Sequence, residues 1–371
     1  MRNFKSFKNL TIIDFKKTNY KILNKSNVKD NIVKGGVFIG ANASGKTNAI
    51  VVIRKLLELL FADAVIYMDG DECIFSSDKD MELEYEFNID SSIIKYLIKY
   101  ELNKEIMIEK LFVDGEEILN RLGAKGESSI TDNSIFTDIS SETLLLRDIY
   151  FNTRFRNNPT LRKWFEFLSN SIYMDAFYRK MFAPSKTKYD LKDYLDEHGV
   201  DEINKFLCEQ NFSHQIEYSN KSEGHMVTFS DPKEKTVYFK RNGLREPIPY
   251  GLESLGNKNL LSFIPPFFNL IKNEGMLIID EFSSGFHNEL ESLLIRYFME
   301  NSDGSQLFLV THSTNILTNS LLRPDQIYIC EFDGENGSKI KRMSDDKPRE
   351  AQNLEKMYLG GVFGGLSNYE D

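Results

Sequence analysis

The chain has 371 residues, a hydrophobic content of 41% and a formal net charge of −10. These values are ordinary for a globular protein of one large or two medium domains. The sequence contains no run of about 18 apolar residues, which excludes a membrane-spanning helix, and its amino terminus lacks the apolar core of a secretory signal. Its three cysteines lie far apart, in no metal-binding spacing. We therefore expect a cytoplasmic protein with reduced thiols and no membrane partner.

The first 40 residues alternate apolar and polar positions, which predicts two or three strands. Residues 40–47 then fit G-x-x-x-x-G-K-[ST], the phosphate-binding P-loop pattern. The apolar residues 36–39 before the loop predict a buried strand, and the residues after it predict a helix to about Ala64. This order of strand, glycine loop and helix points backbone N–H groups and the positive end of the helix at a phosphate.

The P-loop predicts a nucleoside triphosphate ligand, ATP, together with Mg²⁺. Gly40 and Gly45 allow tight turns where the backbone lies against phosphate. Lys46 can reach the β- and γ-phosphates, and the Thr47 hydroxyl can hold the metal ion. The alternative is a glycine-rich turn that binds nothing. The remaining expected nucleotide contacts are Asn42, Ser44 and Asn48.

Residues 72–118 predict a set of antiparallel strands. Residues 81–87 alternate strictly between apolar and acidic side chains, which is typical of a half-exposed strand. Further strands are expected at 93–102 and 105–113, with Asp114 and Gly115 in the turn that follows.

The middle of the chain changes period. Residues 123–141, rich in Gly, Ser and Asp, predict a loop. Residues 142–210 carry apolar side chains at helical spacing, and 214–218, 226–229 and 236–239 predict short strands.

Positive charge gathers between residues 147 and 188. This stretch has nine Lys or Arg against three acidic residues, a net charge of +6 in an otherwise acidic chain. It predicts either a solvated helical face or a docking surface for nucleic acid or an acidic partner.

A second group of chemically active residues follows an apolar segment. Residues 276–279 are apolar and are followed by Asp280 and Glu281. This pattern predicts a buried parallel strand with carboxylates at its C-terminal end, the edge at which open α/β sheets bind ligands. Asp280 would hold Mg²⁺, and Glu281 would accept a proton from the attacking water. The alternative is a strand that ends in two solvated acids.

Residues 306–310 predict another apolar strand, which is followed by Thr311 and His312. A helix at 287–300 separates the two strands, so we expect them to be adjacent and parallel. His312 would then lie near the γ-phosphate.

Together these segments resemble the heads of ABC-type ATPases, the class that includes SMC-like and RecF-like proteins. The resemblance implies an α/β fold with a P-loop core sheet, an antiparallel β subdomain and a helical insertion. It makes His312 the switch histidine and residues 282–287 the D-loop. Ser254 and Gly256, at the start of an apolar helix, take the place of the signature motif that contacts ATP bound to a second subunit. The Q-loop glutamine has no match, since neither Gln210 nor Gln215 has the right context.

The same resemblance divides the chain. Residues 1–122 would form the N-terminal half of the head, 123–245 a mainly helical insertion, and 246–371 the C-terminal half.

Residues 253–256, 280–282 and 311–315 look more narrowly like the "AAA family" ATPases of bacterial anti-phage and abortive-infection systems, such as those of PARIS and Septu. The stretch 106–121 and the tail 355–365 match as well. Such ATPases usually act with a separate effector, often a nuclease encoded nearby. The resemblance therefore implies an ATPase with ATP in a head-to-head dimer or higher oligomer, which controls that effector.

Two other hypotheses stay open. One is a RecF-like DNA-maintenance ATPase that holds DNA on the positive stretch 147–188. The other is a scaffold that binds ATP with little turnover and assembles around a partner, with nucleic acid or a phage protein as candidates.

Overall fold

The computed structural model describes residues 1–62, 68, 70–104, 106–185, 189–220 and 235–366. Its central element is a seven-stranded sheet in the order β11-β10-β15-β16-β3-β17-β18. The strands are β3 (Gly35–Gly40), β10 (Ile172–Asp175), β11 (Lys180–Phe182), β15 (Met276–Asp280), β16 (Gln306–Val310), β17 (Ile327–Phe332) and β18 (Ser338–Arg342).

The five inner strands of this sheet, β10, β15, β16, β3 and β17, are parallel, whereas the outer strands β11 and β18 are antiparallel to their neighbours. The carboxyl ends of the parallel strands therefore meet at one edge. The predicted adjacency of the strands at 276–280 and 306–310 is confirmed by the β15–β16 pairing.

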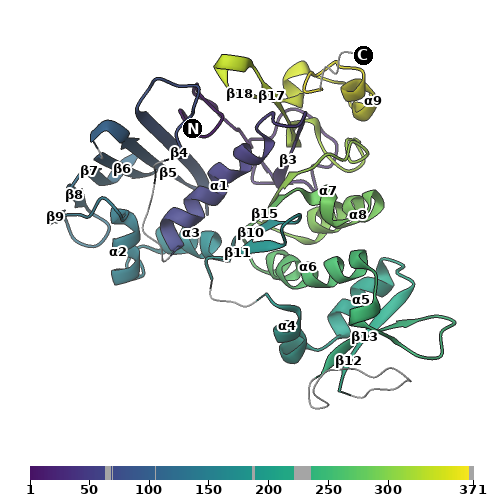
Figure 1. Ribbon diagram of the computed structural model, residues 1–371. Helices are drawn as coiled ribbons and strands as arrows, with labels where there is room; N and C mark the ends of the chain where they lie inside the picture. The colour runs from purple at the N-terminus through teal and green to yellow at the C-terminus, as the bar shows by residue number, and fades with distance from the viewer. Residues whose placement is uncertain (63–67, 69, 105, 186–188, 221–234, 367–371) are drawn as a thin grey trace.

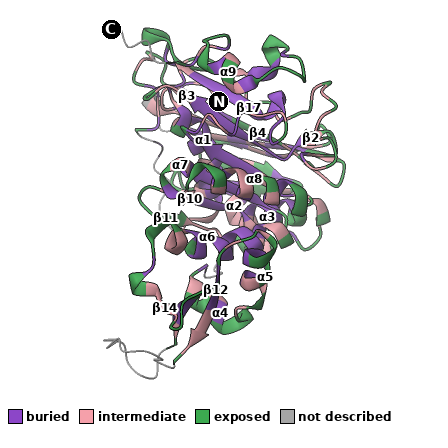
Figure 2. Cartoon of the chain, turned by 90° about the vertical axis from the view of Figure 1, so that its right-hand side faces the viewer, coloured by how far each residue is buried: buried purple, intermediate pink, exposed green. Residues whose placement is uncertain are grey.

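Side chains of the parallel strands point alternately into two cores. Phe38 packs with α1 (Lys46–Phe61) and α3 (Pro159–Asn170) on one face. Val37 and Ile39 pack with α6 (Leu255–Lys272) and α8 (Asn288–Asn301) on the other. Burial on both faces explains why these strands are continuous apolar runs. Figure 2 shows the buried residues gathered in the sheets, while α4 (Leu191–His198) is largely exposed.

A six-stranded antiparallel sheet covers α1, which runs between the two sheets (Figure 1). The Tyr85 hydroxyl of this sheet donates to the Val52 carbonyl of α1 at 2.7 Å. A P-loop core sheet with an antiparallel sheet is the predicted fold of an ABC-type ATPase head. The strands are β4 (Asp80–Ile89), β5 (Ser92–Glu101), β6 (Ile106–Val113), β7 (Glu116–Leu122), β8 (Lys125–Ser128) and β9 (Ser134–Phe136).

The strands expected between 81 and 113 and the turn at Asp114 and Gly115 are confirmed. The prediction that 123–141 is all loop is wrong, because β8 and β9 extend the sheet from β7. These strands are short and mostly polar, so they carry no apolar alternation that would predict them. They form because their backbone pairs with the edge of the neighbouring strand.

The range 123–245 contains the helices α2 (Leu145–Thr153), α3, α4 and α5 (Asp201–Glu209). It also contains β10 and β11 of the central sheet. Its other strands β12 (His214–Ser219) and β13 (Thr236–Arg241) form a small sheet in the order β12-β13-β14 with β14 (Ile248–Pro249). The small sheet lies with α4 and α5 beyond α6 (Figure 1). The division of the chain at 122 and 245 stays a prediction, and the strand expected at 226–229 lies outside the described residues.

The remaining elements are short. Of the strands expected in residues 1–40, β3 is confirmed, and β1 (Val28–Lys29) and β2 (Ile32–Val33) are two residues long. The alternation before residue 28 gives isolated bridges instead of strands, so that part of the prediction is wrong. Later in the chain, α7 (Phe282–Gly285) and α9 (Leu354–Leu359) are also short. Cys73, Cys208 and Cys330 are free thiols. None of the helices in the described part of the chain combines the length and hydropathy needed to cross a bilayer.

A buried ion pair joins the antiparallel sheet to α2. The Glu109 and Arg121 side chains have no exposed surface and approach to 3.0 Å. Glu109 also accepts from the Tyr96 hydroxyl at 2.8 Å and from the backbone N–H of Leu145 at 2.6 Å. Leu144, the residue before α2, offers no capping side chain, so Glu109 caps this helix from another element. Arg121 donates to three backbone carbonyls as well.

We predict that Glu109→Ala lowers the free energy of unfolding by about 3–5 kcal/mol, because it leaves the Arg121 charge buried without its partner. Urea titration followed by circular dichroism measures this loss. Glu116→Ala, an exposed glutamate of the same sheet, should change stability by less than about 0.5 kcal/mol. A loss at Glu109 no larger than at Glu116 would show that the network contributes nothing.

Candidate functional site

The predicted site residues meet at the carboxyl edge of the central sheet. The loop 40–47 follows β3, Asp280 ends β15, and His312 follows β16 by two residues. These strands are neighbours in the order β15-β16-β3, so segments far apart in the sequence form one surface.

The loop conformation requires glycine at both glycine positions of the P-loop pattern. Gly40 and Gly45 have φ values of +149° and +100°. A Cβ at Gly40 would overlap the carbonyl oxygen of Cys330, and one at Gly45 would overlap the Ser338 hydroxyl. Helix α1 begins at Lys46 without a capping side chain. Its first N–H groups are therefore left for an anion.

Lys46 is held in position before any ligand binds. Its side chain is buried, and Nζ donates to the carbonyl oxygens of Gly40 at 3.1 Å and Ala41 at 2.8 Å. An ammonium group has three N–H donors, so one is left for a phosphate oxygen. Burial lowers the pKa of Lys46. The Ser44 hydroxyl is buried without a hydrogen-bond partner among the described residues. Both features fit a bound phosphate.

The residues predicted to hold Mg²⁺ are in contact. The Thr47 hydroxyl donates to Asp280 Oδ1 at 3.1 Å. Burial, together with the nearby carboxylates of Glu281 and Asp175, raises the pKa of Asp280 to about 6, although the hydrogen bond from Thr47 acts in the opposite direction. A hydroxyl and carboxylates are the hard oxygen donors that Mg²⁺ prefers. A divalent cation would also offset the crowded negative charge, so these residues fit the metal ion.

Glu281 and His312 lie close together at the same edge. Glu281 has φ +54°, in the left-handed region, which non-glycine residues adopt uncommonly. Its Oε2 lies 3.8 Å from His312 Nε2, and the two side chains are 34% and 42% exposed. Both are therefore accessible to a nucleotide and to water. The His312 backbone N–H donates to the Ser283 hydroxyl, which ties it to α7.

The two asparagines expected to contact nucleotide lie in different places. Asn42 lines a cavity of about 250 Å³ together with His312. The Asn48 amide donates to the Ser6 hydroxyl at 2.9 Å, which directs it toward the N-terminal segment. Its role toward the nucleotide stays a prediction.

Ser254 and Gly256 do not line this cavity. Ser254 precedes α6, and its hydroxyl accepts from the Asn257 backbone N–H at 3.3 Å. Both residues are exposed, and a Cβ on Gly256 would meet nothing within 4 Å. The buried Glu253 carboxylate holds this helix start through Arg241 at 2.6 Å and the Ser254 backbone N–H at 2.7 Å.

Asp175 is a site residue that the sequence analysis missed. It ends β10 directly opposite Asp280 in the parallel register. Its carboxylate contributes to the raised pKa of Asp280. The sequence pattern that predicted Asp280 is present here too. Ile172, Tyr173 and Met174 form a short apolar run followed by a carboxylate, as in β15.

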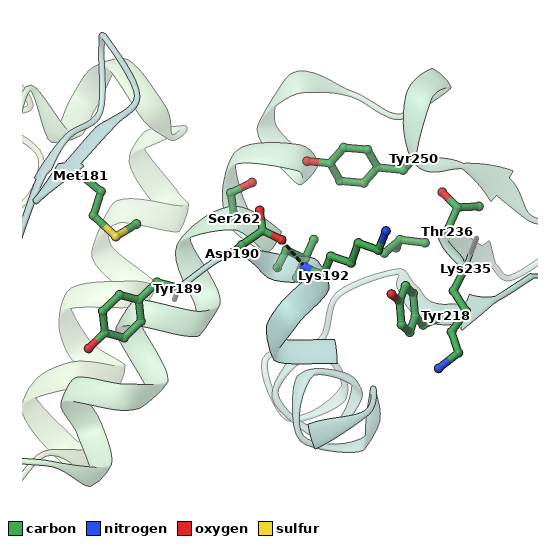
Figure 3. A pocket seen from close by; sticks show the side chains of 11 residues that line it. Met181, Tyr189, Asp190, Lys192, Tyr218, Lys235, Thr236, Tyr250 and Ser262 are labelled. Carbon is green, nitrogen blue, oxygen red and sulfur yellow. Dashed lines mark hydrogen bonds between the residues drawn. The ribbon is translucent and has the colours of Figure 1, made fainter. Parts of the chain in front are cut away.

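Figure 3 shows the side chains that line a larger cavity, of about 450 Å³. Tyr189, Tyr218 and Tyr250 line it together with Lys192 and Lys235. None of the predicted site residues lines it, so it is separate from the nucleotide site.

The sequence profile of one protein family matches residues 37–318. The family is described as "AAA domain, putative AbiEii toxin, Type IV TA system". The match covers the P-loop, the segment 254–256, the two carboxylates and His312. No curated protein sequence matches the chain.

Several solved structures are similar in shape. The SMC head domain from Thermotoga maritima is 16% identical with a TM-score of 0.42, covering 92% of this chain and 96% of the other. The SMC head bound to the C-terminal winged-helix domain of ScpA is 14% identical with a TM-score of 0.46, covering 92% and 94%. The Smc head from Pyrococcus furiosus, bound to the C-terminal domain of ScpA, is 13% identical with a TM-score of 0.41, covering 97% of each chain. At these scores the fold assignment depends on the strand order and pairing described above.

We predict that Asp280→Asn stabilises the ligand-free protein at about pH 8. The folded-state pKa of Asp280, about 6, lies above its ordinary value of 3.8. The folded protein therefore favours the protonated, neutral form of Asp280. This contribution to the free energy of unfolding is fully present below the ordinary pKa and is lost as the pH rises through about 6.

Melting temperatures between about pH 5 and pH 8, without nucleotide or metal, measure this effect. The advantage of Asp280→Asn should shrink toward the acid end. Asp132→Asn, at an exposed position, should show no such trend. A variant less stable than the wild type at pH 8 would contradict the electrostatic assignment.

Proposed function

Because the chain belongs to that AAA-domain family, we propose that it binds ATP with Mg²⁺ and hydrolyses it at a site completed by a second copy of itself. We further propose that the bound nucleotide controls a separate effector, a nuclease, in cytoplasmic defence against phage. The family description names a toxin of a toxin–antitoxin system, which accords with such a role. One observation carries the proposal: the ends of three neighbouring strands bring the P-loop, Asp280 with Glu281, and His312 to one edge.

The geometry supports a division of roles at this edge. Lys46 and the first N–H groups of α1 would bind the β- and γ-phosphates, while Thr47 and Asp280 would hold the metal ion. Mg²⁺ supplies charge neutralisation on the phosphate oxygens. Glu281 would accept the proton of the attacking water. His312, 3.8 Å from Glu281, would orient that carboxylate beside the γ-phosphate.

The exposed start of α6 supports the participation of a second copy. Ser254 and Gly256 are exposed on a helix start that the cavity beside the P-loop does not include. Leu252 and Leu255 beside them are 63% and 57% exposed. A second copy that packs on this helix start would remove both apolar side chains from water. In the proposed dimer, this helix start would face the γ-phosphate bound to the other subunit.

A DNA-maintenance role is the second candidate, and the positive stretch favours it. Arg154, Arg156, Arg162 and Lys163 are all exposed, although Lys163 forms an ion pair with Asp90. The Arg154 guanidinium lies 4.9 Å from the ring of exposed Phe151. A salt-dependent affinity for DNA that is lost when these four cations are neutralised would favour this candidate. The scaffold hypothesis differs from both, because it expects almost no ATP turnover by the wild type.

We predict that Glu281→Gln slows ATP hydrolysis by roughly 10²- to 10⁴-fold, the range for loss of a general base, while ATP binding persists. Phosphate release measures turnover, and calorimetry measures binding. Glu289→Gln, an exposed glutamate of α8, is the matched control and should behave as the wild type. Unchanged turnover in Glu281→Gln would show that another group accepts the proton.

Mixing two inactive variants tests the shared site. Lys46→Ala removes phosphate binding, and Ser254→Arg places a bulky cation where the second copy would meet ATP. Mixed dimers contain one site with both defects and one intact site. A mixture in equal amounts should therefore recover about a quarter of the wild-type hydrolysis rate. A mixture as inactive as either variant alone would argue against a site formed by two copies.

A further inference from the structure

The C-terminal part of the chain forms a wall of the cavity beside the P-loop. Its lining includes Ala41 and Asn42 of the P-loop, His312, and Tyr358, Leu359 and Gly365 of the C-terminal part. Lys46 and Thr47 are not part of its lining. The C-terminal segment, residues 354–366, therefore shares this cavity with the first residues of the P-loop and with His312, which is expected near the γ-phosphate.

Hydrogen bonds hold the segment in this place. The Tyr358 hydroxyl donates to the Gly365 carbonyl at 3.2 Å, which closes the turn that follows α9. The Gly365 N–H donates to Glu331 Oε1 at 2.6 Å. Glu331 belongs to β17, the strand next to β3, so the segment is attached to the sheet beside the P-loop.

The turn at residues 364 and 365 requires glycine because it packs closely on β17. Gly364 and Gly365 have φ values of +79° and +76°, a region that other residues rarely adopt. A Cβ on Gly365 would overlap the Ile329 side chain and lie 3.7 Å from the Cα of Gly40. A Cβ on Gly364 would overlap the Glu331 carboxylate. The turn thus packs directly against the first glycine of the P-loop.

The same segment contacts the loop that carries His312. The Thr314 hydroxyl donates to Glu355 Oε1 at 2.9 Å, and Glu355 belongs to α9. One short segment therefore connects the first turn of the P-loop, through Gly365, to the His312 loop, through Glu355.

We propose that residues 354–366 form a positioning element that sets the distance between the first turn of the P-loop and the His312 loop. Its consequence is selectivity for a nucleoside triphosphate over the diphosphate. The groups it positions, Asn42 and His312, meet the γ-phosphate end. Lys46 and Thr47 at the start of α1, which would serve the phosphates that both nucleotides share, do not line this cavity. This inference rests on the proposed nucleotide-binding function.

Thr314→Val tests it by removing one hydroxyl while keeping the side-chain shape. With Mg²⁺ present, calorimetry would measure the dissociation constants of a non-hydrolysable ATP analogue and of ADP. Losing one hydrogen bond should weaken the ATP analogue by roughly threefold to tenfold and leave ADP within about twofold. Glu355→Gln keeps an acceptor for Thr314 and should behave as the wild type. Val362→Ala, an exposed position of the same segment, is the second control.

Gly365→Ala should likewise weaken binding of the ATP analogue more than binding of ADP. If this variant does not fold, the result for Thr314→Val decides. Equal weakening of both nucleotides, or no change in either, would overturn the positioning role. A wild-type protein that binds neither nucleotide would instead refute the proposed function, and this inference would fall with it.

Discussion

The hydrogen bond from Thr47 to Asp280 joins the two halves of the candidate site. It connects the first turn of α1 to the buried end of β15, and it exists only because β15, β16 and β3 run parallel and end at one edge. It also holds a carboxylate whose burial disfavours its charged form. Asp175 and Glu281 add like charge from two sides. The carboxylates of the ligand-free site therefore repel one another, and a bound cation would offset this repulsion.

The elements that carry the candidate site pack in two different hydrophobic cores. Helix α1 packs on one face of the central sheet and α6 on the other. The P-loop belongs to the first side, and Ser254 at the start of α6 belongs to the second. A change at the nucleotide edge can therefore reach the two faces separately: through α1 toward the antiparallel sheet, and through β15 and α7 toward α6. Since packed cores shift between discrete arrangements rather than deform smoothly, such a layout suits a protein whose surface changes with its ligand.

The sequence predicted those parts of the structure that depend on local pattern. The P-loop, the Asp280 strand and the His312 strand each combine an apolar run with polar residues directly after it, and the structure pairs them as expected. Strands β8 and β9 were missed because their formation depends on the edge of β7. Asp175 was missed because β10 is four residues long and lies within a stretch of helical period. The pairing of Glu109 with Arg121 and the packing of the C-terminal segment on the P-loop were beyond prediction, since both depend on contacts between segments distant in sequence.

The two hydrogen bonds that Lys46 makes to its own loop have a kinetic consequence. Because the lysine and the loop already share one conformation, a nucleotide that arrives need not wait for the backbone to order around it. Association should then proceed near the rate set by diffusion and orientation, and differences in affinity among nucleotides should appear in how slowly each one leaves. The dissociation rate, rather than the association rate, would then determine which nucleotide occupies the site for longest.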